Sequence, residues 1–227
     1  MTELTCLVDP ATGTLVMEGL TWEEAAAVAG DLLPPAHEIN CARPLTSSQL
    51  PRANPTAGIT VRVARVYHGS LVDGPGRRSV VQFQGCPIRC RGCYVPETHA
   101  VDGGAVRSVA DVAAAALDPA GEPRDGCTVL GGEPFFQPAA LAALLRAFKA
   151  RGGHTVVYSG YTLEALIRRP EPEVCEALQL TDLLIDGPFI AALAEGAGEW
   201  RGSRNQRVIV NPWAASRRGT PRNIQEV

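Results

Sequence analysis

The chain has 227 residues, of which 45% are hydrophobic and 20% charged, and its net charge is −3. This composition is typical of a folded globular protein and excludes a disordered or low-complexity chain. The charge balance gives no indication of a nucleic-acid partner. The first residues lack the basic segment of a signal peptide, and no apolar run approaches the roughly 18–20 residues of a membrane span. We therefore expect a cytoplasmic protein with reduced thiols and no membrane partner.

Residues 1–57 are predicted to form a small N-terminal appendage. Apolar runs at 6–8 and 14–17 flank the turn sequence DPATG, a pattern typical of a β-hairpin. Thr21 and Glu24 form a capping box that opens an alanine-rich helix, which Pro34 and Pro35 must end. From Ala36 the chain is rich in Pro, Ser, Thr and Asn, which predicts a linker. The chain therefore divides into an appendage and linker at 1–57 and a core domain at 58–227.

A different pattern begins at Ile59, where apolar and polar residues alternate as on a half-buried strand. Short apolar runs recur at 80–83, 127–130, 155–158, 183–185 and 208–210, and helical patterns follow most of them. One such helix is expected from Pro138, with Leu141, Leu144, Leu145 and Phe148 on one face. The alternation predicts an α/β fold built from βα units. With about five or six parallel strands, the sheet would form a partial, incomplete TIM-type βα barrel.

Four loops that carry glycine or polar residues directly follow predicted strands. They are the cysteine loop, Gly131-Gly132-Glu133-Pro134, Ser159-Gly160-Tyr161 and Asp186-Gly187-Pro188-Phe189. The carboxyl ends of parallel strands face the same way in such folds, and the active site lies on that side. We therefore expect these loops, which are distant in the sequence, to meet in space.

The cysteine loop places Cys86, Cys90 and Cys93 within eight residues. Thiolates bind iron–sulfur clusters and zinc, so the loop predicts a metal site. Three thiolates leave one iron of a four-iron cluster open for a substrate, much as catalytic zinc keeps an open position. Alternatively, His99 completes a Cys3His zinc site that staples a binding module. The spacing alone leaves both hypotheses open.

The other loops offer polar groups to a ligand. Gly131 and Gly132 lack side chains that would keep a ligand from the backbone, and Glu133 can accept hydrogen bonds from a ligand ammonium group. Ser159 is expected either to cap the next helix or to contact a ribose, and Asp186 either to stabilise a turn or to contact a ligand. A polar segment precedes the last strand, and its candidates for binding a ligand carboxylate or positioning a loop are Asn205, Gln206 and Arg207.

The spacing Cys86-x3-Cys90-x2-Cys93, together with GGEP at 131–134, resembles the radical S-adenosylmethionine (radical SAM) superfamily. DGPGR at 73–77, QGC at 84–86 and CYVPET at 93–98 resemble the activating enzymes of glycyl-radical proteins. YSGYT at 158–162, DGPF at 186–189 and RGSRNQR at 201–207 are most similar to the activase of anaerobic (class III) ribonucleotide reductase. The resemblance covers about residues 59–212 and does not extend over 1–57. Where superfamily members often have an aromatic before the third cysteine, this chain has Gly92, with Tyr94 following.

The resemblance implies a [4Fe–4S] cluster on Cys86, Cys90 and Cys93, with S-adenosylmethionine chelating the open iron. One electron, from a donor such as flavodoxin or ferredoxin, would cleave the cofactor to methionine and a 5′-deoxyadenosyl radical. That radical would take a hydrogen from a backbone glycine of a partner glycyl-radical enzyme, such as anaerobic ribonucleotide reductase. No catalytic side chain is predicted beyond the ligands. The predicted cofactor-binding residues are Tyr94, Gly131, Gly132, Glu133, Pro134, Ser159, Asp186, Asn205, Gln206 and Arg207.

Two alternative functions stay open at the level of the sequence. A radical SAM enzyme of the same kind could act on a small molecule or a peptide, with residues 1–57 as its recognition element. A protein of a different class would be the zinc-stapled binding module on Cys86, Cys90, Cys93 and His99. Metal analysis distinguishes the two classes, since one zinc per chain without iron or sulfide excludes the enzyme.

Overall fold

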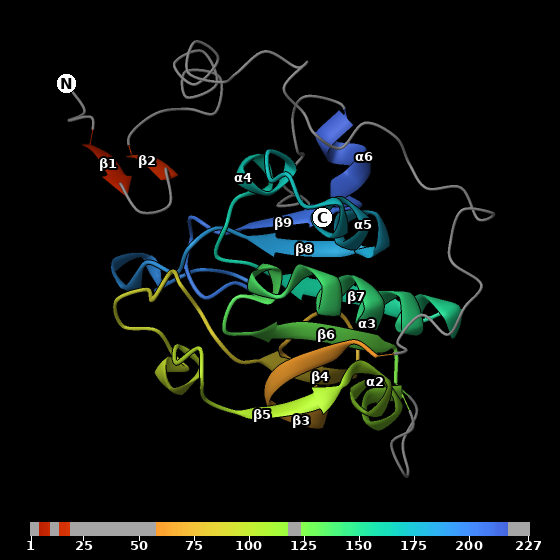
Figure 1. The fold of residues 1–227 in the computed structure, drawn as a ribbon. Coiled ribbons are helices and arrows are strands. Elements are labelled where there is room, and N and C mark those ends of the chain that lie inside the picture. Colours follow the sequence, from red (N-terminus) through yellow and green to blue (C-terminus); the bar gives the residue numbers. More distant parts are fainter. Residues whose placement is uncertain (1–4, 10–13, 19–57, 118–123, 218–227) are drawn as a thin grey trace.

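The computed structural model describes residues 5–9, 14–18, 58–117 and 124–217 (Figure 1). From residue 58 onward, helices flank a seven-stranded sheet. Its strands are β3 (Thr60–Ser70), β4 (Arg78–Phe83), β5 (Ala105–Ser108), β6 (Gly126–Gly131), β7 (His154–Tyr158), β8 (Leu183–Asp186) and β9 (Arg207–Val210). The α-helices are α2 (Val109–Leu117), α3 (Pro138–Ala150), α4 (Leu163–Ile167), α5 (Pro172–Leu180) and α6 (Pro212–Arg217). Short 3-10 helices are η2 (Pro96–Thr98), η3 (Pro134–Phe136) and η4 (Ala191–Leu193).

The strands follow the order β5-β3-β4-β6-β7-β8-β9 across the sheet. β4, β6, β7 and β8 pair in parallel, which confirms an α/β fold with a mostly parallel sheet. The prediction of five or six parallel strands is wrong for β3 and β9. β3 pairs antiparallel with β4, and β9 pairs antiparallel with β8. Parallel neighbours need a crossover, usually a helix. The connections at 71–77 and 187–206 contain no α-helix, so the chain returns antiparallel.

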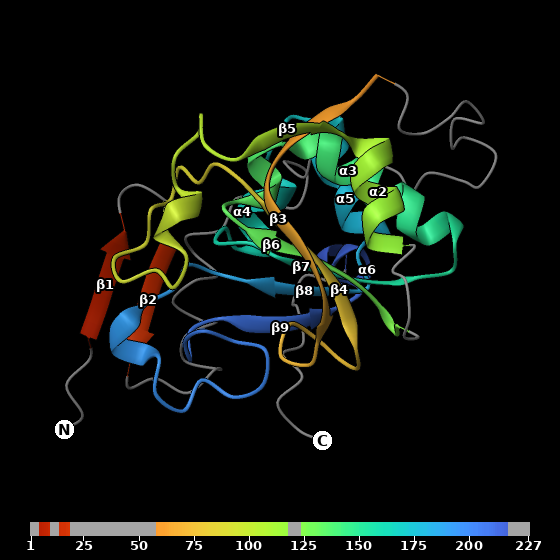
Figure 2. The same cartoon turned by 90° about the horizontal axis from the view of Figure 1, so that it is seen from below.

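The two faces of the sheet have different surroundings because side chains alternate along each strand. On one face, Val81 and Phe83 of β4 and Val129 of β6 belong to the main hydrophobic core. The helices α2, α3 and α5 lie on this side (Figure 2). The opposite face carries polar side chains and a smaller apolar cluster of Val156, Leu183, Ile185 and Val208. One face therefore supplies the core, and the other is available for a site.

Local sequence signals account for the helices α2, α3 and α4. α3 begins at Pro138, and its predicted apolar face is fully buried at Leu141, Leu144, Leu145 and Phe148. Ser108 caps α2, because its Oγ accepts the Asp111 N–H at 3.0 Å. Thr162 caps α4 in the same way, accepting the Ala165 N–H at 3.2 Å. Each cap satisfies a backbone donor that the first helical turn leaves unpaired.

The amino ends of the parallel strands are joined by a fully buried arginine, Arg78. Its Nη2 donates to the Cys127 and His154 carbonyls at 2.6 and 3.0 Å, and its Nε donates to Thr128 Oγ1 at 3.0 Å. A buried guanidinium is tolerated only when its donors are bonded in this way. Arg78 therefore ties β4, β6 and β7 together at the end of the sheet opposite the four predicted loops.

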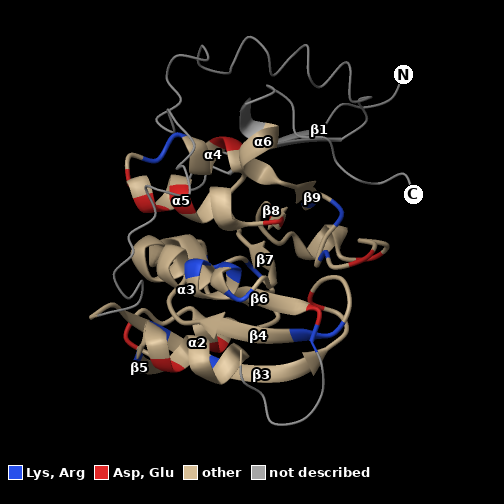
Figure 3. Ribbon diagram, turned by 90° about the vertical axis from the view of Figure 1, so that its right-hand side faces the viewer, with Lys and Arg blue, Asp and Glu red and all other residues tan. Residues whose placement is uncertain are grey.

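The N-terminal segment forms a separate two-stranded antiparallel sheet of β1 (Thr5–Asp9) and β2 (Thr14–Glu18). This confirms the predicted hairpin, while the predicted helix at 21–33 and the linker lie outside the described residues. Within the described parts, no helix combines the length and apolar character of a membrane span. Figure 3 shows Lys and Arg interspersed with Asp and Glu along the described elements, in keeping with the small net charge of −3.

Candidate active site

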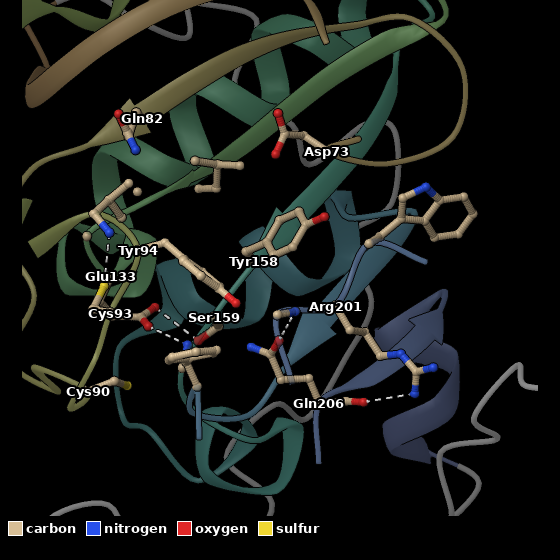
Figure 4. A pocket seen from close by; sticks show the side chains of 18 of the residues that line it. Asp73, Gln82, Cys90, Cys93, Tyr94, Glu133, Tyr158, Ser159, Arg201 and Gln206 are labelled. Atoms are coloured by element: carbon tan, nitrogen blue, oxygen red, sulfur yellow. Dashed lines mark hydrogen bonds between the residues drawn. The ribbon is translucent and has the colours of Figure 1, made fainter. Parts of the chain in front are cut away.

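A cavity of about 700 Å³ opens at the carboxyl ends of the parallel strands. The registers of β4 with β6 and of β7 with β8 bring these strand ends to one edge of the sheet. All four predicted loops contribute to its lining, so the expected convergence is confirmed. The predicted site residues among the lining are Cys86, Cys90, Cys93, Tyr94, Gly131, Gly132, Glu133, Ser159 and Gln206. Figure 4 shows Tyr94 and Tyr158 pointing toward the middle of this space.

Backbone hydrogen bonds from Gly85 and Cys86 tie the start of the cysteine loop to its end at Thr98 and His99. The Gly85 N–H donates to the Thr98 carbonyl at 2.8 Å, and the Cys86 N–H donates to the His99 carbonyl at 3.3 Å. At the other end, Cys93 Sγ accepts the Val95 N–H at 3.5 Å. These bonds fold residues 86–99 into a closed loop whose three thiols border the cavity.

The three cysteines border one cavity, and His99 lines it as well. No three His, Cys, Asp or Glu side chains in the described part of the chain are close enough to hold one metal ion. A single zinc needs all its ligand sulfurs within about 2.3 Å of the metal. The choice between zinc and an iron–sulfur cluster therefore rests on the comparison with known proteins.

The thiols of this loop are partly removed from water. Burial raises the pKa of Cys86 and Cys90, although backbone N–H groups of Arg89 and Phe189 oppose the rise by bonding to the respective sulfurs. The bond from Phe189 links the loop after β8 to the second cysteine. A bound metal would favour the thiolate and so oppose this rise.

Glu133 is completely buried at the junction of two loops. Its Oε1 accepts the Phe135 N–H and the Ser159 hydroxyl at 3.0 Å each, and its Oε2 accepts the Gly160 N–H at 2.8 Å. Burial raises the pKa of Glu133 to about 7, against these hydrogen bonds, which lower it. Glu133 therefore fastens the loop after β6 to the loop after β7, and its carboxylate also borders the cavity.

The glycines of the loop after β6 are required by protein atoms that lie against them. A Cβ at Gly132 would lie 2.4 Å from the Gly85 carbonyl oxygen, and one at Gly131 would lie 2.4 Å from Gln82 Cγ. Gly131 also adopts a φ of +112°, which side chains rarely allow. Both glycines line the cavity, but their small size also lets the β6 loop pack directly on the β4 loop.

Four of the predicted cofactor-binding residues do not line this cavity: Pro134, Asp186, Asn205 and Arg207. Asp186 is 1% exposed and accepts hydrogen bonds from the Leu163 N–H and from the guanidinium of Arg207. Asn205 donates to the Pro188 carbonyl at 2.7 Å. The neighbouring Gln206 does reach the cavity, while its Nε2 donates to the Gly187 carbonyl at 2.9 Å. These residues hold the loop after β8 in shape.

The far end of the cavity is polar and was not predicted as part of the site. It is lined by Arg65, Tyr67, Asp73, Gln82 and Tyr158, with Trp200 nearby in the lining. Asp73 Oδ2 accepts hydrogen bonds from the hydroxyls of Tyr67 and Ser70 at 3.0 and 2.5 Å. The sequence contained a pattern that could have indicated this polar end, because Arg65 and Tyr67 are two residues apart and therefore share one face of β3.

Comparison with known proteins connects this geometry to a family. A family described as a 4Fe-4S single cluster domain matches residues 72–209, more than half of the chain. The anaerobic ribonucleoside-triphosphate reductase-activating protein of Salmonella typhi is 30% identical over 154 residues, which are 65% of this chain and 97% of that protein. The chain belongs to this family of 4Fe–4S, radical SAM activating enzymes. It is accordingly an iron–sulfur enzyme.

Other relatives have similar names. The activating protein of the same name in Vibrio cholerae is 32% identical over 62% of this chain and 92% of its own. A pyruvate formate-lyase-activating enzyme of Listeria monocytogenes is 36% identical over 55% of this chain, which spans about half (51%) of that enzyme. Among solved structures, QueE from Escherichia coli aligns with 56% of the chain at 17% identity and a TM-score of 0.39, too low to carry an argument.

Proposed function

We propose that this radical SAM activase reductively cleaves S-adenosylmethionine and installs a glycyl radical on a partner enzyme of the anaerobic ribonucleotide reductase type. The observation that carries the proposal is one cavity bordered by three cysteine thiols and by the loops after β6 and β7. The similarity to anaerobic ribonucleotide reductase-activating proteins supports the choice of partner. Cys86, Cys90 and Cys93 are the proposed cluster ligands.

The residues present fit a four-iron cluster with one open iron. The cavity supplies three thiols, and the buried His99 Nε2 beside them has no hydrogen-bond partner among the described residues. When bound, the cluster supplies the electron that cleaves the sulfonium cofactor. Gly131, Gly132 and Glu133 border the space beside the thiols and are the proposed contacts of the cofactor's methionyl group. Glu133 keeps acceptor capacity on its carboxylate beyond the three donors that it already binds.

The remaining predicted residues are proposed to act in two ways. Tyr94, Ser159 and Gln206 line the cavity and are candidates for contacts to the cofactor. Pro134, Asp186, Asn205 and Arg207 support the loops and reach the cofactor only through them. The ring of Tyr94 also packs on Phe189, with 4.8 Å between centroids, and both residues line the cavity.

We propose that a loop of the partner enters the cavity. We infer that the twisted sheet is the incomplete barrel expected from the sequence, open toward the partner. Exposed apolar side chains stand at the rim, among them Leu71, Val72 and Tyr94. Residues 58–227 are proposed as the catalytic core, and residues 1–57 as an appendage. The electron is proposed to come from a cytoplasmic donor such as flavodoxin or ferredoxin.

Anaerobic purification followed by iron, sulfide and zinc analysis tests the proposal first. We expect four irons and four sulfides per chain in the wild type, and 5′-deoxyadenosine from S-adenosylmethionine once a strong reductant is added. Cys90→Ala should lose both the iron and the product. The matched control is Cys127→Ala, a buried cysteine of β6 that does not line the cavity, and it should keep both.

The partner is tested by a second experiment. Wild-type protein, cofactor and reductant are mixed with anaerobic ribonucleotide reductase, and the glycyl radical is measured by electron paramagnetic resonance. A glycyl-radical signal that depends on Cys90 supports the proposed partner. Product formation from S-adenosylmethionine without any such signal indicates a radical SAM enzyme with a small-molecule or peptide substrate. If the protein contains zinc instead of iron, the proposal that it is a radical SAM enzyme is wrong.

A further inference from the structure

His99 carries a ring nitrogen that the described protein leaves without a partner. The residue lines the cavity, and its Nε2 is buried and makes no hydrogen bond. Its main chain is fixed, because its N–H donates to the Pro96 carbonyl at 3.1 Å and its carbonyl accepts the Cys86 N–H at 3.3 Å. The main chain of His99 is therefore fixed beside the first cysteine of the loop.

An orphaned buried polar atom calls for an explanation. Buried donors and acceptors in native proteins are nearly all hydrogen-bonded, since leaving one unpaired costs stability. The carboxylate of Glu133, which also borders the cavity, is already bonded to Phe135, Ser159 and Gly160. Because His99 lines the cavity, a group bound there is placed to supply a partner for Nε2.

The imidazole could meet an iron–sulfur group in two ways. An unprotonated Nε2 could ligate iron, or an Nε2–H could donate a hydrogen bond to sulfur. Ligation would fill the open iron that the proposed cofactor needs. Donation to sulfur leaves that iron open for the cofactor and is therefore the arrangement that fits the proposed function.

We propose that His99 donates its Nε2–H to a sulfur of the cluster, either a cysteine thiolate or a bridging sulfide, and thereby raises the reduction potential. The inference rests on the proposed function, because it needs a cluster on Cys86, Cys90 and Cys93. Hydrogen bonds to the sulfurs are one of the means by which a protein sets this potential. The donor stabilises the reduced cluster more, because one added electron increases the negative charge on sulfur.

The test is a redox titration of the anaerobically reconstituted full chain, with the reduced cluster followed by electron paramagnetic resonance. In His99→Phe, which lacks the donor, the ratio of reduced to oxidised cluster at the wild-type midpoint should fall about tenfold, which is 59 mV for one electron. His99→Gln offers an amide N–H and should stay within about threefold of wild type. The matched control is His68→Phe, a histidine of β3 that does not line the cavity, and its ratio should not change.

Several results would overturn the inference. One is a wild-type potential in His99→Phe with full iron and sulfide, which would mean that water, or nothing, occupies Nε2. Another is a strong magnetic coupling of the cluster to labelled histidine nitrogen, which would identify His99 as an iron ligand. Loss of iron from His99→Phe and His99→Gln alike would show that the residue is needed to hold the cluster. A wild type that binds no iron contradicts the proposed function itself.

Discussion

Replacing Arg207 with methionine separates a structural role from a cofactor-binding role at the end of β8. The Arg207 guanidinium donates to both oxygens of Asp186, at 2.9 and 2.5 Å, and to both oxygens of Glu164, at 3.0 and 2.7 Å. The side chain of Asp186 is 1% exposed, whereas that of Glu164 is 28% exposed. The substitution therefore leaves the Asp186 carboxylate buried, and within the described residues only the Leu163 N–H still donates to it.

Removing one partner of a buried ion pair costs about 3–5 kcal/mol, because the other charge is left uncompensated. We expect the lower end, about 3 kcal/mol, since Arg207 itself is 19% exposed. The free energy of unfolding is measured by urea titration under anaerobic conditions. Adding Asp186→Asn should recover about half of the loss, because it removes the buried charge. Arg204→Met, at an exposed position, is the control and should change stability by less than about 0.5 kcal/mol.

A pH series gives an independent check on the same substitution. Burial already raises the pKa of Asp186, and loss of Arg207 should raise it further. A carboxylate with a raised folded-state pKa is most stabilising in its protonated form, so the penalty of Arg207→Met should shrink as the pH falls. A loss below about 1 kcal/mol, combined with abolished binding of S-adenosylmethionine, would refute the reasoning and make Arg207 a cofactor contact.

Three further outcomes are expected. Because burial raises the pKa of Glu133 to about 7 from its ordinary 4.5, its contribution to stability is complete below about pH 4.5 and is lost as the pH rises through 7. Relative to Glu133→Gln, the wild type should lose about 3 kcal/mol of unfolding free energy across this range. If the free energies of unfolding of the two proteins depend on pH in the same way, the raised pKa of Glu133 is wrong. Leu144→Ala, in the fully buried face of α3, should cost about 2–5 kcal/mol in urea titrations, whereas Val210→Ala, exposed on β9, should cost far less. Gly160→Ala places a Cβ 2.5 Å from Ile88 Cδ1 of the cysteine loop, so we expect a lower iron content per chain than in the wild type.

Much of the fold could be predicted from patterns formed by residues that are close together in the sequence. The apolar face of α3 and the hairpin of β1 and β2 both depend on residues within a few positions of one another. The convergence of the four loops also followed from the sequence, because parallel strands direct their carboxyl ends to one edge. Cys86, Cys90 and Cys93 could be nominated because ligands within a single loop keep a recognisable spacing.

The sequence by itself therefore determined the parallel block and the strands of the sheet other than β5, and it predicted a metal-binding loop. Only the tertiary structure decided the directions of β3 and β9, the pairing of Asp186 with Arg207, and the polar end of the cavity at Arg65, Tyr67 and Asp73. The physical reason is the range of the interactions. Strand pairing and ion pairs join residues that are distant in the chain, and a carboxylate has the same sequence signal whether it meets a ligand or a guanidinium. Whether a carboxylate pairs with a ligand or with a guanidinium depends on which groups are buried beside it in the fold, and a local sequence pattern does not contain that information.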